Sequence, residues 1–95
     1  MIKSFVDKET EKLFSRHLSK RLPQNIHRNA RMKLEILDSA SALQDLTIPP
    51  GNRLEKLAGD QKGQHSIRIN QQRHICFAWR SGDVYEVEIV DYDKG

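Results

Sequence analysis

The feature that most constrains the fold is a change of hydrophobic period at Pro49-Pro50-Gly51-Asn52. Before this breaker, apolar residues recur at the three- and four-residue spacing of an amphipathic helix. After it, they alternate with polar residues, as in a half-buried strand. This order is typical of an α+β domain whose helices pack on one face of an antiparallel meander. The 95 residues suffice for a single domain spanning 1–95 and are too few for two.

Two helices are predicted before the breaker, after a short N-terminal strand from Ile2 to Val6. Asp7 can cap the first helix. The apolar face of that helix is predicted to contain Thr10, Leu13, Phe14, His17 and Leu18. Leu22-Pro23 separates it from a second helix, whose apolar stripe is Ile26, Ala30, Leu34 and Leu37. Arg28 and Arg31 lie off this stripe, so we expect both to be exposed, with Glu35 as a surface partner of Arg31.

Strand candidates follow the breaker, beginning with a short one from Arg53 to Leu57. Gly59 to Gly63 and Ser81-Gly82-Asp83 are predicted turns. The residues predicted to face the helices are Ile67, Ile69, Ile75, Phe77, Trp79, Tyr85, Val87 and Ile89. The opposite, solvated face is predicted to carry Ser66, Arg68, Asn70, His74, Cys76, Glu86 and Glu88, with Tyr92 if the alternation continues.

The chain has a formal charge of +3, and its charges are unevenly distributed. Basic residues dominate from Met1 to Lys33 and from Arg53 to Gly82, whereas the tail after Gly82 is acidic. The run Arg16, Lys20, Arg21, Arg28, Arg31 and Lys33 contains no acidic residue. Such a run can hold RNA or receive an acidic partner protein, and ordinary solvation explains any single member.

Several classes of protein lose support from what the sequence lacks. Cys76 is the only cysteine, so an intrachain disulfide is impossible. There is no secretory leader and no apolar run long enough to span a bilayer, so we expect a cytoplasmic protein without a membrane partner. Common zinc, P-loop and dinucleotide-binding motifs are also missing.

Four blocks of sequence together resemble the HigB-type killer toxins of the RelE/ParE superfamily. They are Met1-Ile2-Lys3-Ser4-Phe5, the stretch from Pro49 through Leu57 and on to Gly63–Asn70, Ile75-Cys76-Phe77-Ala78-Trp79, and Val87-Glu88-Ile89-Val90-Asp91-Tyr92. The resemblance covers nearly the whole chain. The predicted order of strand, two helices and meander also matches the fold of this superfamily.

The resemblance implies the toxin of a type II toxin–antitoxin system that cuts mRNA on the ribosome. In such toxins the ribose 2′-OH attacks the adjacent phosphate, so neither a metal nor another cofactor is expected. The implied partners are the ribosome, mRNA and a HigA-like helix-turn-helix antitoxin, and operator DNA is contacted only through that antitoxin. Two alternatives remain open: a ParE-like inhibitor of gyrase, and a weakened or inactive toxin that binds the antitoxin as a co-repressor.

The predicted catalytic set combines the solvated sheet face with the family tail. It consists of Arg68, Arg73, His74, Asp91, Tyr92 and Asp93. Relatives usually carry an aromatic–arginine pair where this chain has Arg73 and His74, and they usually end in Asp-Tyr-His where it has Asp93 last. These departures predict reduced activity. The side chain of Arg73 is expected to start on the face opposite to His74.

A second set of residues is predicted to bind RNA or the ribosome without taking part in the chemistry. It consists of Arg28, Arg31, Arg53 and Lys56. Glu55 occupies a position where some relatives place a catalytic histidine, but it is predicted to be an ordinary surface residue. His65 is expected to be structural, and His17 is expected in the core or at an interface. Cys76 is expected to act as a small buried hydrophobic residue.

Overall fold

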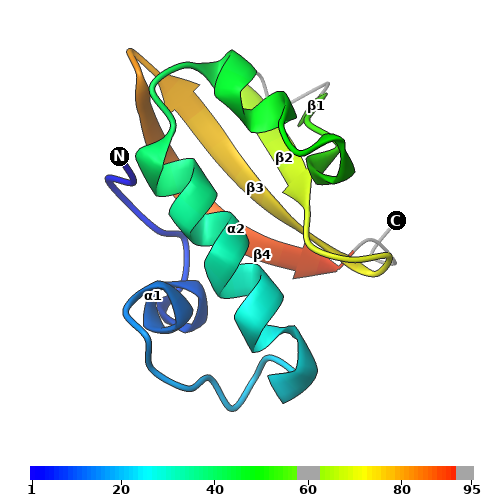
Figure 1. Cartoon of the computed structure of the whole chain (residues 1–95). Helices are drawn as coiled ribbons and strands as arrows, with labels where there is room; N and C mark the ends of the chain where they lie inside the picture. Colours follow the sequence, from blue (N-terminus) through cyan, green and yellow to red (C-terminus); the bar gives the residue numbers. More distant parts are fainter. Residues whose placement is uncertain (58–62, 92–95) are drawn as a thin grey trace.

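A computed structural model describes residues 1–57 and 63–91. Its helical elements are α1 (Lys8–Phe14), η1 (Gln24–Ile26), α2 (His27–Ser39), η2 (Leu43–Thr47) and η3 (Pro50–Asn52). The strands β1 (Glu55–Lys56), β2 (Gln64–Arg68), β3 (Arg73–Arg80) and β4 (Asp83–Asp91) form an antiparallel sheet in that order. The helices lie on one side of the sheet, with α2 running across it (Figure 1). The predicted α+β architecture is therefore confirmed.

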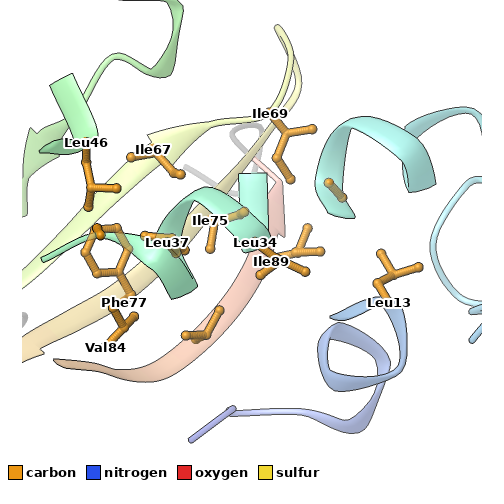
Figure 2. Close-up of a cluster of buried hydrophobic side chains, with 13 residues drawn as sticks. Leu13, Leu34, Leu37, Leu46, Ile67, Ile69, Ile75, Phe77, Val84 and Ile89 are labelled. Atoms are coloured by element: carbon orange, nitrogen blue, oxygen red, sulfur yellow. The ribbon is translucent and has the colours of Figure 1, made fainter. Parts of the chain in front are cut away.

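The core lies between α2 and the sheet. Ala30, Leu34 and Leu37 are fully buried, as the helical stripe predicts. Figure 2 shows Leu34 and Leu37 beside Ile75 and Phe77 of β3. Full burial of one such side chain contributes about 1.5–3 kcal/mol, so this layer dominates the stability of a domain this small.

The N-terminal segment is held against β4 without forming a regular strand. Ile2 and Phe5 make isolated parallel bridges to Val84 and Val87. The amide of Ile2 also donates to Asp38 Oδ1 at the end of α2 (2.9 Å). The predicted strand from Ile2 to Val6 is thus reduced to two bridges along the edge of the sheet.

Helix α1 begins as predicted but ends earlier. The side chain of Asp7 accepts a hydrogen bond from the amide of Thr10 (2.8 Å), which caps the helix. The helix stops at Phe14 because Arg16 adopts a left-handed conformation (φ 66°). The amides of Arg16 and His17 then donate to the carbonyls of Leu13 and Lys12, which is the Schellman arrangement. The prediction that His17 and Leu18 belong to the apolar face of this helix was wrong, because both lie beyond its end and are exposed.

Arg31 is not the free surface cation that its place on α2 predicted. Its Nε donates to the carbonyl oxygen of Leu13 (3.0 Å), and the side chain is partly buried. Glu35, its predicted partner, instead forms an ion pair with Arg16 (3.1 Å). Both contacts tie α2 to the end of α1, so Arg31 has a structural task in this fold.

A bulge in β4 corrects the predicted facing of Tyr85. Cys76 pairs with Glu88 and Ala78 pairs with Tyr85, so β4 has one more residue than β3 between these pairs. Glu86 carries the irregularity with a positive φ of 56°. The bulge places Val84 in the core in place of Tyr85, whose ring instead lies under the guanidinium of Arg80 (5.1 Å).

The predicted breaker is organised around a buried amide. Asn52 is fully buried, and its Nδ2 donates to the carbonyl oxygens of Leu46 and Ile48 (both 3.2 Å). Its Oδ1 accepts a hydrogen bond from Lys33 Nζ of α2. Burial lowers the pKa of Lys33. Two members of the basic run, Lys33 and Arg31, are therefore engaged within the fold.

We expect Asn52→Leu to destabilise the protein by at least about 3 kcal/mol. The substitution leaves two carbonyl groups and the Lys33 ammonium without their partner, and each unsatisfied buried group costs about 1–3 kcal/mol. Urea denaturation measures the change. Asn25→Leu, at an exposed position in η1, is the matched control and is expected to change the free energy of unfolding by less than about 0.5 kcal/mol. Equal effects of the two variants would contradict a special role for Asn52.

Candidate functional site

The sheet face that the helices leave uncovered brings together residues from β1, β2 and β3. Arg68 pairs directly with His74, and His74 pairs with Val90 on its other side. Glu55 pairs with Ser66, one row along the same face. Directly opposite residues have Cβ atoms about 5 Å apart, so Arg68 and His74 are neighbours on this face.

The middle of this face is less solvated than the alternating pattern predicted. Ser66 and Ala78 are only 3% and 4% exposed. Burial, with a smaller effect of Glu88, raises the pKa of the Cys76 thiol to about 11. Burial also raises the pKa of Glu88, and Asp7 adds to that shift. The thiol is thus protonated at neutral pH. Cys76 was expected to be buried, but its side chain is only partly buried.

Arg68 is held in place by the turn that follows β2. Its Nε donates to the carbonyl oxygen of Asn70 (3.0 Å). Asn70 Oδ1 accepts from the amides of Gln72 and Arg73 (both 2.8 Å), which fixes the turn. Arg68 forms no ion pair with Glu86 or Glu88, and Glu86 pairs with Arg80 instead (3.1 Å). Arg68 is therefore a positioned cation beside His74.

His74 is partly buried and favours its neutral form. Burial lowers its pKa, while the nearby carboxylates of Glu55 and Asp91 act in the opposite direction. A neutral imidazole at pH 7 can accept a proton, as a general base must. The pair of Arg68 and His74 thus combines a cation suited to a phosphate with a group suited to proton transfer.

Arg73 and Asp91 lie at the same end of the sheet, but their positions in the strands belong to the other face. Arg73 pairs with Asp91, and this pair is on the same face as the next pair but one, Ile75 with Ile89 of the core. Strand alternation predicted this face for Arg73. Arg73 Nη2 and Asp91 Oδ2 are 4.0 Å apart, and Gln72 Nε2 donates to the same oxygen (3.2 Å). Asp91 nevertheless influences His74 through its charge.

The structure therefore joins only part of the predicted catalytic set. Arg68 and His74 meet on one face, whereas Arg73 and Asp91 form an ion pair on the other. Tyr92 and Asp93, and most of the predicted turn from Gly59 to Gly63, lie outside the described residues. Within residues 1–57 and 63–91, no group of three His, Cys, Asp or Glu side chains is placed to hold a metal ion.

Glu55, predicted to be an ordinary surface residue, belongs to the candidate site. It is exposed, and its pairing with Ser66 puts it on the face of Arg68 and His74. Lys56, predicted to contact RNA, pairs with His65 and so points to the opposite face. Strand alternation predicts that Glu55 and Lys56 point to opposite faces of the sheet. Because β1 has only two residues, its pairing with β2 is needed to tell which residue faces which way.

The remaining predicted residues lie apart from this pair. Arg53 is exposed in a left-handed conformation (φ 46°) after η3. Arg28 is exposed in the first turn of α2, within the helix layer. His65 stacks on Phe77 with 6.0 Å between ring centroids, so its predicted structural role is confirmed. No helix in the described part of the chain is long and apolar enough to cross a membrane.

We expect Glu55→Gln to lower the pKa of His74. The carboxylate of Glu55 stabilises the protonated imidazole and so raises the pKa of His74, whereas burial lowers it. Without this carboxylate, less negative charge opposes the effect of burial. An NMR titration of the His74 ring protons measures the shift. Glu35→Gln, which removes an exposed carboxylate paired with Arg16, is the control and is expected to leave this titration unchanged. An unchanged pKa in Glu55→Gln would mean that Glu55 does not act on His74.

Comparison with known proteins agrees with this architecture. A family model described as the RelE-like toxin of the type II toxin–antitoxin system HigB matches residues 3–93. Toxin HigB-1 of Vibrio cholerae is 46% identical over 83 residues, covering 86% of this chain and 87% of the relative. Endoribonuclease HigB of Proteus vulgaris is 29% identical over 92 residues, covering 97% of this chain and 99% of the relative.

A similar fold is found among solved structures. The solution structure of a conserved hypothetical protein from Helicobacter pylori has a TM-score of 0.53 and 14% identity, and the match covers 98% of this chain and 97% of that one. At this identity the likeness concerns the fold alone. With the family model spanning nearly the whole sequence, the chain belongs to the RelE-like HigB toxins of type II toxin–antitoxin systems.

Proposed function

We propose that this toxin is a ribosome-dependent endoribonuclease that cuts mRNA without a metal ion and is inhibited by its antitoxin. The observation that carries the proposal is the direct pairing of Arg68 with His74 on the sheet face left open by the helices. The name of the Proteus vulgaris relative, Endoribonuclease HigB, supports the same activity.

The proposed reaction uses the nucleophile that RNA itself supplies. The 2′ oxygen forms a bond to the adjacent phosphorus, and the bond from phosphorus to the 5′ oxygen of the next nucleotide breaks. The products are a 2′,3′-cyclic phosphate and a free 5′-OH. His74 accepts the proton of the 2′-OH, and Arg68 stabilises the additional negative charge on the phosphate as it develops.

The tail supplies the remaining roles in this proposal. Tyr92 holds a base by stacking, and Asp93 protonates the leaving 5′ oxygen. For Asp93 to act as an acid at neutral pH, its pKa must lie well above that of an ordinary carboxyl group. Asp91 and Arg73 act as positioning residues, because they pair with each other on the far side of the strand end.

We assign the docking on ribosomal RNA to exposed cations near the sheet edge. Arg53 and Lys56 are both exposed: Arg53 lies two residues before β1, and Lys56 is the second residue of β1. Arg31 fits this role poorly, since it donates to Leu13, and Arg28 belongs to the helix layer. The proposed setting is the cytoplasm, with a HigA-like helix-turn-helix antitoxin that carries the operator-binding surface of the complex.

We expect induced expression to stop growth and to produce cuts in ribosome-bound mRNA. Arg68→Gln and His74→Gln are each expected to slow cleavage by about 10²–10⁴-fold, the usual contribution of acid–base and charge-stabilising groups. Primer extension on a reporter message measures the cuts. Arg80→Gln removes an exposed arginine from β3, the strand of His74, and serves as the control. Intact message together with inhibited gyrase would overturn the proposal in favour of a ParE-like activity.

His74 and Asp93, which differ from the residues usual in HigB-type toxins, allow a test that looks for a gain of activity. We expect His74→Arg combined with Asp93→His to raise cleavage, because it restores the residues that HigB-type toxins usually carry at these positions. Single-turnover cleavage on purified ribosomes compares the double variant with the natural protein. Equal or lower cleavage by the double variant would contradict the expected weakening and would identify His74 as the better group at this site.

A further inference from the structure

The loop between α1 and η1 exposes an apolar side chain beside a surface hollow. Leu18 is 69% exposed, although it is a large aliphatic residue. The adjoining hollow has a volume of about 340 Å³, and its lining includes Leu18, Ser19, Lys20, Leu22, Pro23 and His27. In Figure 1 this loop runs from α1 to the start of α2, within the helix layer.

The loop is fixed by hydrogen bonds on its inner side. Ser19 Oγ donates to Glu9 Oε1 (2.6 Å) and accepts from the amide of Leu22 (3.3 Å). The carbonyl oxygen of Leu22 accepts a hydrogen bond from His27 Nε2 (2.9 Å). Ser19 and His27 are only 4% and 6% exposed. The exposed position of Leu18 is therefore built into the fold, and a partner that bound there would not have to order the loop.

Lys20 lines the hollow, and Arg21 and Arg28 directly adjoin its lining residues Leu22 and His27 in the chain. Lys20, Arg21 and Arg28 are exposed, and none of the three forms an ion pair with a described residue. Arg16, by contrast, is already paired with Glu35 (3.1 Å). An apolar centre within a charged rim is the usual anatomy of a protein–protein interface. A surface for RNA would instead place its cations where the phosphates lie, and an aliphatic centre contributes little to phosphate binding.

We propose that this hollow is the docking site of the antitoxin. Membership of a type II system implies a protein antitoxin as the partner. The chemistry of the surface specifies the segment that fits: an aliphatic or aromatic side chain packed against Leu18 and Leu22, flanked by acidic residues that pair with Lys20, Arg21 and Arg28. This inference rests on the family and on the helix layer. It does not depend on the ribonuclease activity, because Arg68 and His74 lie on the other face of the sheet.

The test measures binding to the antitoxin encoded beside this chain. Leu18→Asp is expected to weaken the affinity at least about thirty-fold, the loss typical of a central interface residue. Ile48→Asp is the matched control, because Ile48 is an equally exposed aliphatic residue (72%) in a different loop. Titration calorimetry with the purified proteins gives both affinities, and thermal unfolding confirms that both variants are folded. Arg21→Glu with Arg28→Glu is expected to flatten the dependence of this affinity on salt concentration.

Growth assays separate docking from catalysis. Cells that express Leu18→Asp are expected to stop growing whether or not the antitoxin is co-expressed, whereas Ile48→Asp is expected to be neutralised like the natural chain. Equal antitoxin affinity of the Leu18→Asp and Ile48→Asp variants would overturn the proposal. Loss of co-sedimentation with ribosomes in Leu18→Asp, with antitoxin binding intact, would assign the surface to RNA instead. If the toxin proves not to cut RNA, the measured affinities still decide where the antitoxin docks.

Discussion

The packing of α2 against β3 is the contact on which the rest of this small domain depends. Leu34 and Leu37 are fully buried against the layer that contains Ile75 and Phe77. Other parts are attached to α2 by polar contacts: α1 through Arg31, and η3 through Lys33 and Asn52. Arg31 and Lys33 both belong to the basic run that the sequence offers to RNA or a partner protein, but here they make contacts within the fold. The basic surface available to partners is therefore smaller than the composition indicates.

The register of strand pairing, as much as the type of residue, determines which polar side chains meet on the open face of the sheet. The pairing of β2 with β3 sets Arg68 opposite His74, and the pairing of β1 with β2 adds Glu55 to the same face. A shift of one residue would bring Arg73 to this face and send His74 into the helix layer. The turn fixed by Asn70 holds the register at this end, and the bulge at Glu86 absorbs the extra residue farther along β4.

The sequence was sufficient to predict features that depend on local pattern. The apolar stripe of α2, the cap at Asp7, the antiparallel meander and the opposite faces of Arg73 and His74 all follow from periodicity and side-chain chemistry. The neighbouring positions of Arg68 and His74 also follow from strand alternation once the two strands are paired by a short turn.

The features that could not be predicted depend on contacts between distant residues or on rare backbone conformations. Arg16 and Glu86 adopt left-handed conformations without being glycine, so nothing in their identity marks the end of α1 or the bulge that moves Tyr85. The acceptor of Arg31 is a carbonyl group 18 residues away. The proximity of Glu55 to His74 required the register of three strands.

The contacts of the N-terminal segment with β4 have a consequence for when the protein can fold during its synthesis. The amide of Glu86 donates to Ser4 Oγ, and the amide of Ile89 donates to Thr10 Oγ1, across 82 and 79 residues of chain. Both segments must be present before these bonds can form. During synthesis, β4 leaves the ribosome long after the N-terminal segment, which therefore has no edge to bind until β4 has been made. The sheet that carries Arg68 and His74 is completed only at that point, and a chain interrupted before β4 lacks the edge against which its N-terminal segment packs.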